Sequence, residues 1–272
     1  MPELPEVETV RRGLQPHLAG RRIVEADAHP SAKFRAAPEA IGATVTSVGR
    51  RGKYLLIALD DGRTLVIHLG MTGRLGMREA GPQPSDDDAD DPHLRAWWLL
   101  DDGRTLEFRD MRRFGRIAVV GDDLTELPTL AALGPEPFDD AFDADHLWRA
   151  VNRSQIRVKT QLLGQRVVAG VGNIYADEAL WRAQVHPGAR RISRPAAVRL
   201  HAAIIDVLSE GIEHGGTTLR DYRTVAGEEG TNQHRLDCYG RAGQPCPRCA
   251  STLRRSVIDG RGTTHCPRCQ RH

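Results

Sequence analysis

Four cysteines near the end of the chain constrain its fold more than any other feature of the sequence. Cys246 and Cys249 are separated by two residues, as are Cys266 and Cys269, and 16 residues lie between the two pairs. This spacing is typical of a zinc site with four thiolate ligands, which is tetrahedral and closed and therefore structural. Two disulfides are the alternative, which a cytosolic location disfavours. We expect one structural Zn²⁺ ion.

The segment between the cysteine pairs is predicted to form a β-hairpin. Its strands would be residues 252–258 and 260–265, turning at Asp259 and Gly260, because an Asp-Gly pair suits a tight hairpin turn. The last 35 residues hold seven Arg and one Asp and have too little apolar material for a core, so the metal would stabilise this finger. Arg261 would then project from a rigid hairpin, and the fifth cysteine, Cys238, would be a small buried residue.

Charge is divided unevenly along the chain. Residues 1–150 carry 19 Lys and Arg against 26 Asp and Glu, whereas residues 151–272 carry 19 against 10. A basic C-terminal part is typical of a protein that binds an anionic polymer, and a solvated imbalance is the alternative. No apolar run reaches the length of a membrane span, and the N-terminus lacks the pattern of a secretory signal. We therefore expect a cytoplasmic, nucleoid-associated protein.

The two parts of the chain also differ in hydrophobic pattern. Short apolar segments separated by Asp-Gly turns predict a β-sandwich or flattened barrel, and they lie at residues 54–59, 64–69, 95–100, 105–108 and 116–120. A passage rich in Asp, Glu and Pro follows, and helical spacing then appears at residues 145–151, 158–163, 173–183 and 195–214. Residues 216–235 have no clear period and predict a long loop, and the acidic run at 86–91 predicts a solvated one.

The N-terminus is a candidate reactive group. Once Met1 is removed, Pro2 carries a free secondary amine, and an α-amine has a reference pKa of roughly 8, so that part of it is neutral and nucleophilic at physiological pH. Glu3 is available for proton transfer. The alternative is that these residues are only a solvated lead into a helix.

A helix is expected directly behind this terminus. Pro5 suits a first helical turn, and apolar residues recur at helical spacing over residues 7–18. The positive end of the helix dipole would oppose an ammonium at the terminus and so favour the neutral amine. Glu6 falls in the first turn, where it is either part of the reactive centre or a simple capping acid.

Two further features suggest contacts with phosphate. Gly170 and Gly172 stand immediately before a predicted helix, whose first N–H groups suit a phosphate, although glycines there often serve only the turn. Only three of the 38 basic residues are Lys, namely Lys33, Lys53 and Lys159. Each of them marks a position where a compact ammonium is preferred to a guanidinium, unless the lysine is retained by chance.

Several segments, in order and nearly end to end, resemble the formamidopyrimidine-DNA glycosylases, bacterial base-excision repair enzymes that remove oxidised purines and cut the strand. They are MPELPEVETVRRGL at the start, RRGKYLL at 50–56, HLGMTG at 68–73, RRFG at 112–115, VGNIYADEAL at 171–180, HPGARRIS after it, GGTTLRDY at 215–222, and YGRAGQPCPRC through HCPRC at the end. Two positions depart from the family pattern: Met111 stands where Pro commonly precedes two Arg, and Gly164 replaces a common Asp.

The resemblance implies an α+β fold of three parts: an N-terminal helix with a catalytic β-sandwich (1–130), a helical DNA-binding domain with a helix-two-turn-helix motif (131–235), and the zinc finger (236–272). DNA would lie in a cleft between the domains. The catalytic set would be Pro2 as nucleophile, Glu3 as acid and base, Lys53 and Arg261.

The resemblance also assigns DNA contacts outside the catalytic set. Lys159 and Asn173 would hold phosphates beside the lesion, as would Arg261 from the finger. Another group, Met71, Arg112 and Phe114, would fill the gap left by an extruded nucleotide, because a base inside a duplex must leave the stack to be reached.

The function expected is therefore that of a bifunctional DNA glycosylase and abasic-site lyase that acts on 8-oxoguanine and formamidopyrimidines in double-stranded DNA, as a monomer. One alternative is a sister enzyme for oxidised pyrimidines. Another is a non-catalytic protein of the same fold that binds damaged DNA, which the intact Pro2 and Glu3 disfavour.

Overall fold

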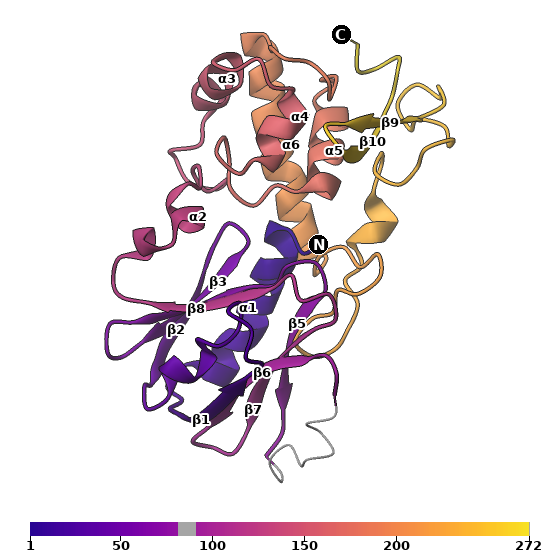
Figure 1. Cartoon of the computed structure of the whole chain (residues 1–272). Coiled ribbons are helices and arrows are strands. Elements are labelled where there is room, and N and C mark those ends of the chain that lie inside the picture. Colours follow the sequence, from indigo (N-terminus) through magenta and orange to yellow (C-terminus); the bar gives the residue numbers. More distant parts are fainter. Residues whose placement is uncertain (81–90, 272) are drawn as a thin grey trace. The chain divides into compact units, whose positions relative to one another are not determined.

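The computed structural model describes residues 1–80 and 91–271, and the chain forms two compact units (Figure 1). The first unit comprises Met1–Ala131 and His214–Thr231, and the second comprises Ala132–Glu213 and Asn232–His272. Most of the acidic run predicted as a solvated loop at 86–91 lies outside the described residues. Within the described part of the chain, no helix has the length and apolar character needed to cross a membrane.

Helix α1 (Leu4–Leu18) opens the first unit. It has the apolar face expected from the sequence, and Val7, Val10, Leu14 and Leu18 of that face are buried in the core of the sandwich. This confirms the helix predicted behind the N-terminus, including the place of Pro5 in its first turn.

Two antiparallel four-stranded sheets form the rest of this unit, as the alternating apolar segments predict. One has the order β1-β6-β7-β5 and the other β2-β3-β4-β8. The strands are β1 (Ile23–Ala28), β2 (Val45–Arg51), β3 (Tyr54–Leu59), β4 (Thr64–His68), β5 (Gly73–Arg78), β6 (Leu94–Leu100), β7 (Thr105–Asp110) and β8 (Arg116–Val120). Short helices η1 (Ala37–Ala40), η2 (Leu124–Glu126) and α2 (Pro128–Ala131) complete it.

The register of the second sheet brings three polar side chains into one row. Tyr54 of β3 is paired with His68 of β4, and His68 is paired with Arg116 of β8. The rings of Tyr54 and His68 lie 4.7 Å apart between their centroids. The hairpin turn at the other end contains Gly62 with a φ of +84°, which an Asp-Gly turn accommodates without strain.

The second unit is helical, with a small two-stranded sheet. Its helices are α3 (Ala144–Asn152), α4 (Val158–Leu163), α5 (Asn173–Arg182), α6 (Arg194–Glu213) and the short η3 (Asn232–Arg235), and its strands are β9 (Arg254–Ile258) and β10 (Arg261–His265). Every residue of α5 from Ile174 to Trp181 is buried, so this helix is the centre of the unit. The mixed helix and sheet fold predicted from the sequence is confirmed.

Two buried acids on α5 hold the finger segment. Glu178 accepts hydrogen bonds from the backbone N–H groups of Asp237, Cys238 and Tyr239, at 3.0, 2.9 and 2.6 Å. Asp177 accepts one from the N–H of Thr264 at 2.8 Å. A buried carboxylate is tolerated only where such donors replace its hydration, so these bonds fix the finger on α5.

The predicted long loop at 216–235 is irregular up to residue 231, as expected, and ends in the short helix η3. Part of it belongs to the first unit. Residues His214–Thr231 cluster with the sandwich, whereas Asn232 and the residues after it cluster with the helices. The predicted domain limits at 130 and 235 remain predictions. The 214–231 segment, near the C-terminal end of the span assigned to the helical domain, clusters with the first unit.

Candidate functional site

The N-terminal residues are fixed by the first turn of α1. Glu3 precedes the helix in an extended conformation and is 2% exposed, and Pro2 is buried. The Glu3 N–H donates to the Glu6 carboxylate at 2.8 Å, which is the reciprocal bond of a capping box. The residue predicted as nucleophile therefore precedes a helix start with a defined geometry.

Glu6 also ties the terminus to a segment more than 200 residues away in sequence. Its second carboxylate oxygen accepts the N–H of Thr217 at 2.7 Å, and the side chain is 1% exposed. The Tyr222 hydroxyl donates to the carbonyl of Gly215 at 3.0 Å and lies 3.4 Å from that of Glu6. Burial, followed by the Glu6 charge, raises the pKa of the Tyr222 phenol, so it stays a donor. Glu6 is thus more than a capping acid.

Lys53 lies at the turn between β2 and β3 and is 6% exposed. Near it, His68 accepts the N–H of Gly70 through Nδ1 at 3.1 Å. Burial first, and then the charges of Lys53 and Arg116, lower the pKa of His68 to about 4, so this imidazole is neutral at physiological pH. Sequence reasoning missed His68, because a lone histidine at the end of an apolar strand carries no distinguishing signal.

The three residues predicted to fill a gap in DNA come together on two adjacent loops. The guanidinium carbon of Arg112 lies 4.8 Å from the centroid of the Phe114 ring. Met71 and Phe114 are apolar yet 37% and 46% exposed, and Arg112 is also exposed. Such side chains remain available to enter a stack of bases.

Asp110 joins the loop that contains Met71 to the loop that contains Arg112 and Phe114. Its buried carboxylate accepts hydrogen bonds from the Thr72 hydroxyl at 2.5 Å, the Arg112 N–H at 3.2 Å and the Gly115 N–H at 2.7 Å. The loops also touch through their backbones, since a Cβ on Gly70 would lie 2.4 Å from the nitrogen of Gly115. Sequence reasoning missed Asp110, whose role depends on pairing across the sheet.

Lys159, predicted to contact phosphate, is completely buried in the second unit. Its Nζ lies 2.6 Å from Asp177 Oδ1, and it donates to the carbonyl of Gly262 at 3.0 Å and to Thr263 Oγ1 at 2.8 Å. Burial raises the pKa of Asp177 to about 6, although the Lys159 charge opposes this rise. The ammonium therefore holds the start of β10 in place.

Asn173 and Arg261 lie beside this buried pair. Asn173 is the first residue of α5 and donates through Nδ2 to the carbonyl of Gly262 at 3.1 Å. Arg261 is exposed at the first position of β10, as the hairpin prediction requires.

Asp259 in the hairpin turn accepts hydrogen bonds from Arg157 and Thr160, which attaches the hairpin to α4. The turn lies at the predicted position, and its backbone is left-handed, with φ of 46° at Asp259 and 78° at Gly260.

The four cysteines predicted as zinc ligands cluster in space. The Sγ atoms of Cys246, Cys249, Cys266 and Cys269 all lie within 4.8 Å of one another, which fits tetrahedral Zn²⁺ with four thiolates. The neighbouring Trp181 indole donates to Cys246 Sγ at 3.4 Å. Donors of this kind stabilise thiolate ligands in a metal site. Cys238 is completely buried beside the cluster, as expected, and its thiol lies 3.1 Å from the carbonyl of Thr264.

Comparison with known families gives three matches in chain order. Residues 1–117 match the formamidopyrimidine-DNA glycosylase N-terminal domain, and residues 133–223 match the formamidopyrimidine-DNA glycosylase H2TH domain. Residues 243–271 match the zinc finger found in FPG and IleRS, which agrees with the cysteine cluster and with one structural zinc ion.

Similar proteins match over the whole chain. A formamidopyrimidine-DNA glycosylase of Thermus thermophilus is 46% identical, with 99% of this chain and 98% of the relative covered, and one of Desulforamulus reducens is 43% identical, with 100% and 99% covered. The crystal structure of the Thermus protein superposes with a TM-score of 0.88 over 99% of this chain and 98% of that one. A Lactococcus lactis Fpg variant in complex with DNA containing Fapy-dG is 33% identical, with a TM-score of 0.88 and full coverage of both chains.

Proposed function

The chain belongs to the formamidopyrimidine-DNA glycosylase family, and on that premise we propose that it is a bifunctional enzyme that excises oxidised purines from duplex DNA and then cuts the strand. The substrates would be 8-oxoguanine and formamidopyrimidines. The similar proteins carry the glycosylase name, and one of the similar structures holds DNA with Fapy-dG. The lyase step and the nucleophile rest on the chemistry of the residues.

The proposed reaction begins at the nitrogen of Pro2. With Met1 removed, this nitrogen attacks C1′ of the damaged nucleotide, the bond from C1′ to the base breaks, and the base leaves with the electron pair and takes up a proton. Glu3 donates and accepts the protons of these steps. The sugar ring opens and an iminium forms between Pro2 and C1′.

A secondary amine suits the lyase step. Its iminium has no N–H proton to lose, so the cation persists and withdraws electrons from the sugar. A proton then leaves C2′ and the 3′ phosphate departs, and a second elimination releases the 5′ phosphate. A primary amine such as that of lysine forms an imine that loses its charge on deprotonation, which weakens the electron sink.

The observation that carries this proposal is the fixed position of the N-terminus. Glu3 is buried and its N–H is held by Glu6, whose other oxygen is held by Thr217. Geometric control of a nucleophile and its acid–base partner is worth several orders of magnitude in rate. If the N-terminal residues were only a solvated lead into a helix, Glu6 would not need to be buried with two backbone N–H partners.

The remaining residues are proposed to contact DNA or to support those that do. Met71, Arg112 and Phe114 would fill the space of the extruded nucleotide, with Arg112 bonding to the orphaned base. Lys53, Asn173 and Arg261 would contact phosphates, and Lys53 also the leaving oxygen. For Lys159 we favour an indirect role, since its buried ammonium is engaged with Asp177 and β10 and fixes the place of Arg261.

Trapping with borohydride tests the mechanism. A duplex carrying 8-oxoguanine opposite C is incubated with the protein and borohydride, and mass spectrometry of the intact chain establishes whether Met1 is absent. The iminium should be reduced to a stable amine that joins Pro2 to DNA. The matched control is Pro2→Gly, which keeps a terminal amine but loses the secondary one. A chain that lacks Met1 and yields no covalent product with the duplex would refute the proposal.

A comparison of two substrates distinguishes the proposed activity from that of the sister enzyme for oxidised pyrimidines. A duplex with thymine glycol opposite A is compared with the 8-oxoguanine duplex at equal concentration. We expect faster excision of the purine, because Met71, Arg112 and Phe114 are all present and the 216–235 loop is long. Faster excision of thymine glycol would assign the chain to oxidised pyrimidines. Tight binding without excision of either base would indicate a non-catalytic protein.

A further inference from the structure

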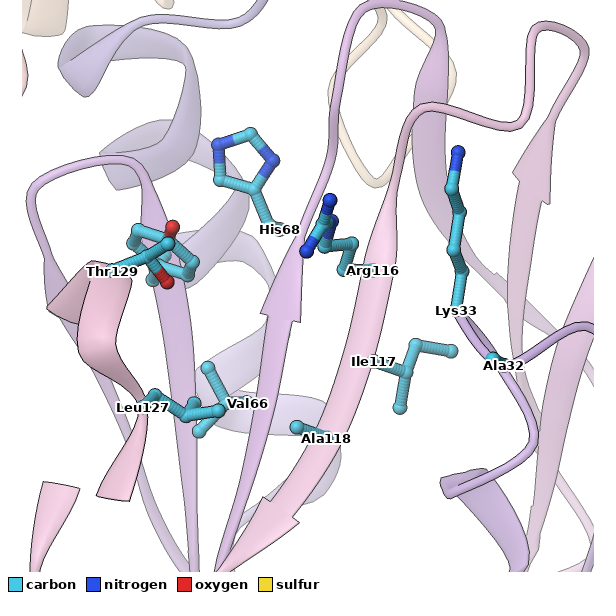
Figure 2. Close-up of a pocket in the computed structure, with 10 residues that line it drawn as sticks. Ala32, Lys33, Val66, His68, Arg116, Ile117, Ala118, Leu127 and Thr129 are labelled. Atoms are coloured by element: carbon cyan, nitrogen blue, oxygen red, sulfur yellow. The ribbon is translucent and has the colours of Figure 1, made fainter. Parts of the chain in front are cut away.

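Lys33 is the lysine to which the mechanism above assigns no role. It lies in the segment after β1, where its carbonyl accepts the N–H of Ile117 at 2.7 Å. Its Nζ reaches the loop before β8 and donates to the carbonyl of Arg113 at 2.6 Å. Lys33, His68 and Arg116 are among the residues that line a pocket of about 290 Å³. Figure 2 shows these side chains, with that of Lys33 extended.

The carbonyl that Lys33 holds belongs to a residue with an unusual backbone. Arg113 has a φ of 55°, in the left-handed region that residues with a Cβ rarely adopt. It stands between Arg112 and Phe114, so its conformation sets the directions in which these two side chains leave the loop. An ammonium donor on the Arg113 carbonyl favours this conformation over the ordinary ones that would turn the carbonyl away.

The same ammonium lies close to the side chain of Phe114. Lys33 Nζ is 5.6 Å from the centroid of the ring, and the Arg112 guanidinium carbon is 4.8 Å from it. A cation over an aromatic face is attracted by its negative charge density. Lys33 therefore contacts both the backbone of this loop and the side chain that the loop presents.

Asp110 holds the other side of this loop. It binds the N–H groups of Arg112 and Gly115 and the Thr72 hydroxyl, and Thr72 follows Met71 directly. The loop is thus held by an anion at its N–H groups and by a cation at its carbonyl. Both contacts are made to backbone atoms, which leaves the Arg112 and Phe114 side chains exposed.

We propose that Lys33 is a positioning residue that sets Arg112 and Phe114 in the arrangement needed to replace an extruded nucleotide. This inference rests on the proposed function. Lys33 would act through the loop and make no contact with the reacting atoms. Its removal should slow the excision of a base that must leave a duplex, and it should spare the chemistry at a sugar that has already lost its base.

The experiment compares Lys33→Met with the parent on two substrates. The first is 8-oxoguanine opposite C in a duplex, and the second is a preformed abasic site in a single strand, where no gap in a stack has to be filled. A misplaced group of this kind costs about 10- to 100-fold in rate. We expect that loss in kcat/KM on the duplex lesion and equal borohydride trapping on the single strand. Lys33→Arg, which keeps a donor, should retain most of the activity.

Two controls separate positioning from phosphate binding. Arg116→Met removes a neighbouring charge from the same pocket and should behave as the parent on both substrates. The slope of log binding constant against log salt should be equal in Lys33→Met and the parent, whereas loss of one phosphate contact lowers it by about 0.9. Thermal melting establishes that each variant is folded.

Several results would overturn the inference. They are a Lys33→Met variant with parental kinetics on the duplex lesion, an equal loss on both substrates, a loss of the same size in Arg116→Met, or a salt slope reduced by about 0.9. Failure of the parent itself to excise 8-oxoguanine would instead overturn the proposed function, so the two failures are distinguishable.

Discussion

Replacing Lys159 with Met tests how the second unit holds its hairpin. Lys159 and Asp177 are 0% and 1% exposed and their charged atoms lie 2.6 Å apart. Met retains an unbranched stem but has no donors, so Asp177 keeps the Thr264 N–H, while the Gly262 carbonyl and the Thr263 hydroxyl lose the ammonium. Breaking one partner of a buried pair costs about 3–5 kcal/mol of unfolding free energy, and we expect a loss in that range at pH 8.

The loss of unfolding free energy should depend on pH, because protonation of Asp177 removes the unpaired buried charge. Its pKa is already raised to about 6 with Lys159 present, and removal of the lysine raises it further. A folded pKa above the unfolded value of about 3.9 means that the folded state prefers the protonated acid. The difference in unfolding free energy between Lys159→Met and the parent should therefore shrink as pH falls from the Asp177 pKa of the variant to that of the parent, about 6. It should shrink by about 1.4 kcal/mol for each pH unit.

Urea titrations at pH 8 and pH 6, followed by circular dichroism and by release of zinc, measure these free energies. The double variant Lys159→Met/Asp177→Leu should recover most of the loss, since removing both charges can be nearly neutral. Arg157→Met is the matched control, because its pair with Asp259 is 40% exposed on both sides and contributes at most about 1 kcal/mol. A single variant within 0.5 kcal/mol of the parent, or a double variant no better than the single, would refute the reasoning.

Two further predictions concern the finger and the sandwich. Cys249→Ser should abolish DNA binding and lower the zinc content measured by elemental analysis while the helical signal persists, and retained zinc and binding would contradict a metal-dependent finger. His68 has a pKa of about 4 against roughly 6.5 unfolded, so the unfolded state binds the proton first and stability falls by up to about 3 kcal/mol as pH drops through this window. His68→Leu should remove that part of the acid sensitivity in thermal melts at pH 7 and 4.5, and parallel curves would count against it.

Local features of the chain were predictable where local physics determines them. The strand at 54–59 and the helix at 158–163 begin and end as predicted, because alternation and helical spacing are properties of neighbouring residues. The hairpin turn at Asp259 and Gly260 follows from the left-handed backbone that this pair tolerates. The cysteine cluster follows from ligand spacing alone.

Long-range contacts of the site were not predictable in this way. Glu6 has the position of a capping acid, and it does cap α1, but its bond to Thr217 joins residues that no local pattern relates. Asp110 is one of many acids in its strand region, and only the pairing of the sheet brings it to Thr72. The burial of Lys159 was missed for the same reason, since the acid that neutralises it lies on another helix.

The retention of lysine in this arginine-rich chain has a physical explanation at Lys159. At Lys159 the ammonium meets three acceptors, Asp177 Oδ1, the Gly262 carbonyl and Thr263 Oγ1, at 2.6, 3.0 and 2.8 Å, one for each of its three N–H bonds. A planar guanidinium carries five donors in one plane and needs more room, so it cannot satisfy this site. At Lys33 the ammonium meets one carbonyl beside the Phe114 ring, a contact that an arginine donor can also make. Chance retention does not explain the Lys159 arrangement, because it depends on a compact donor with three N–H bonds.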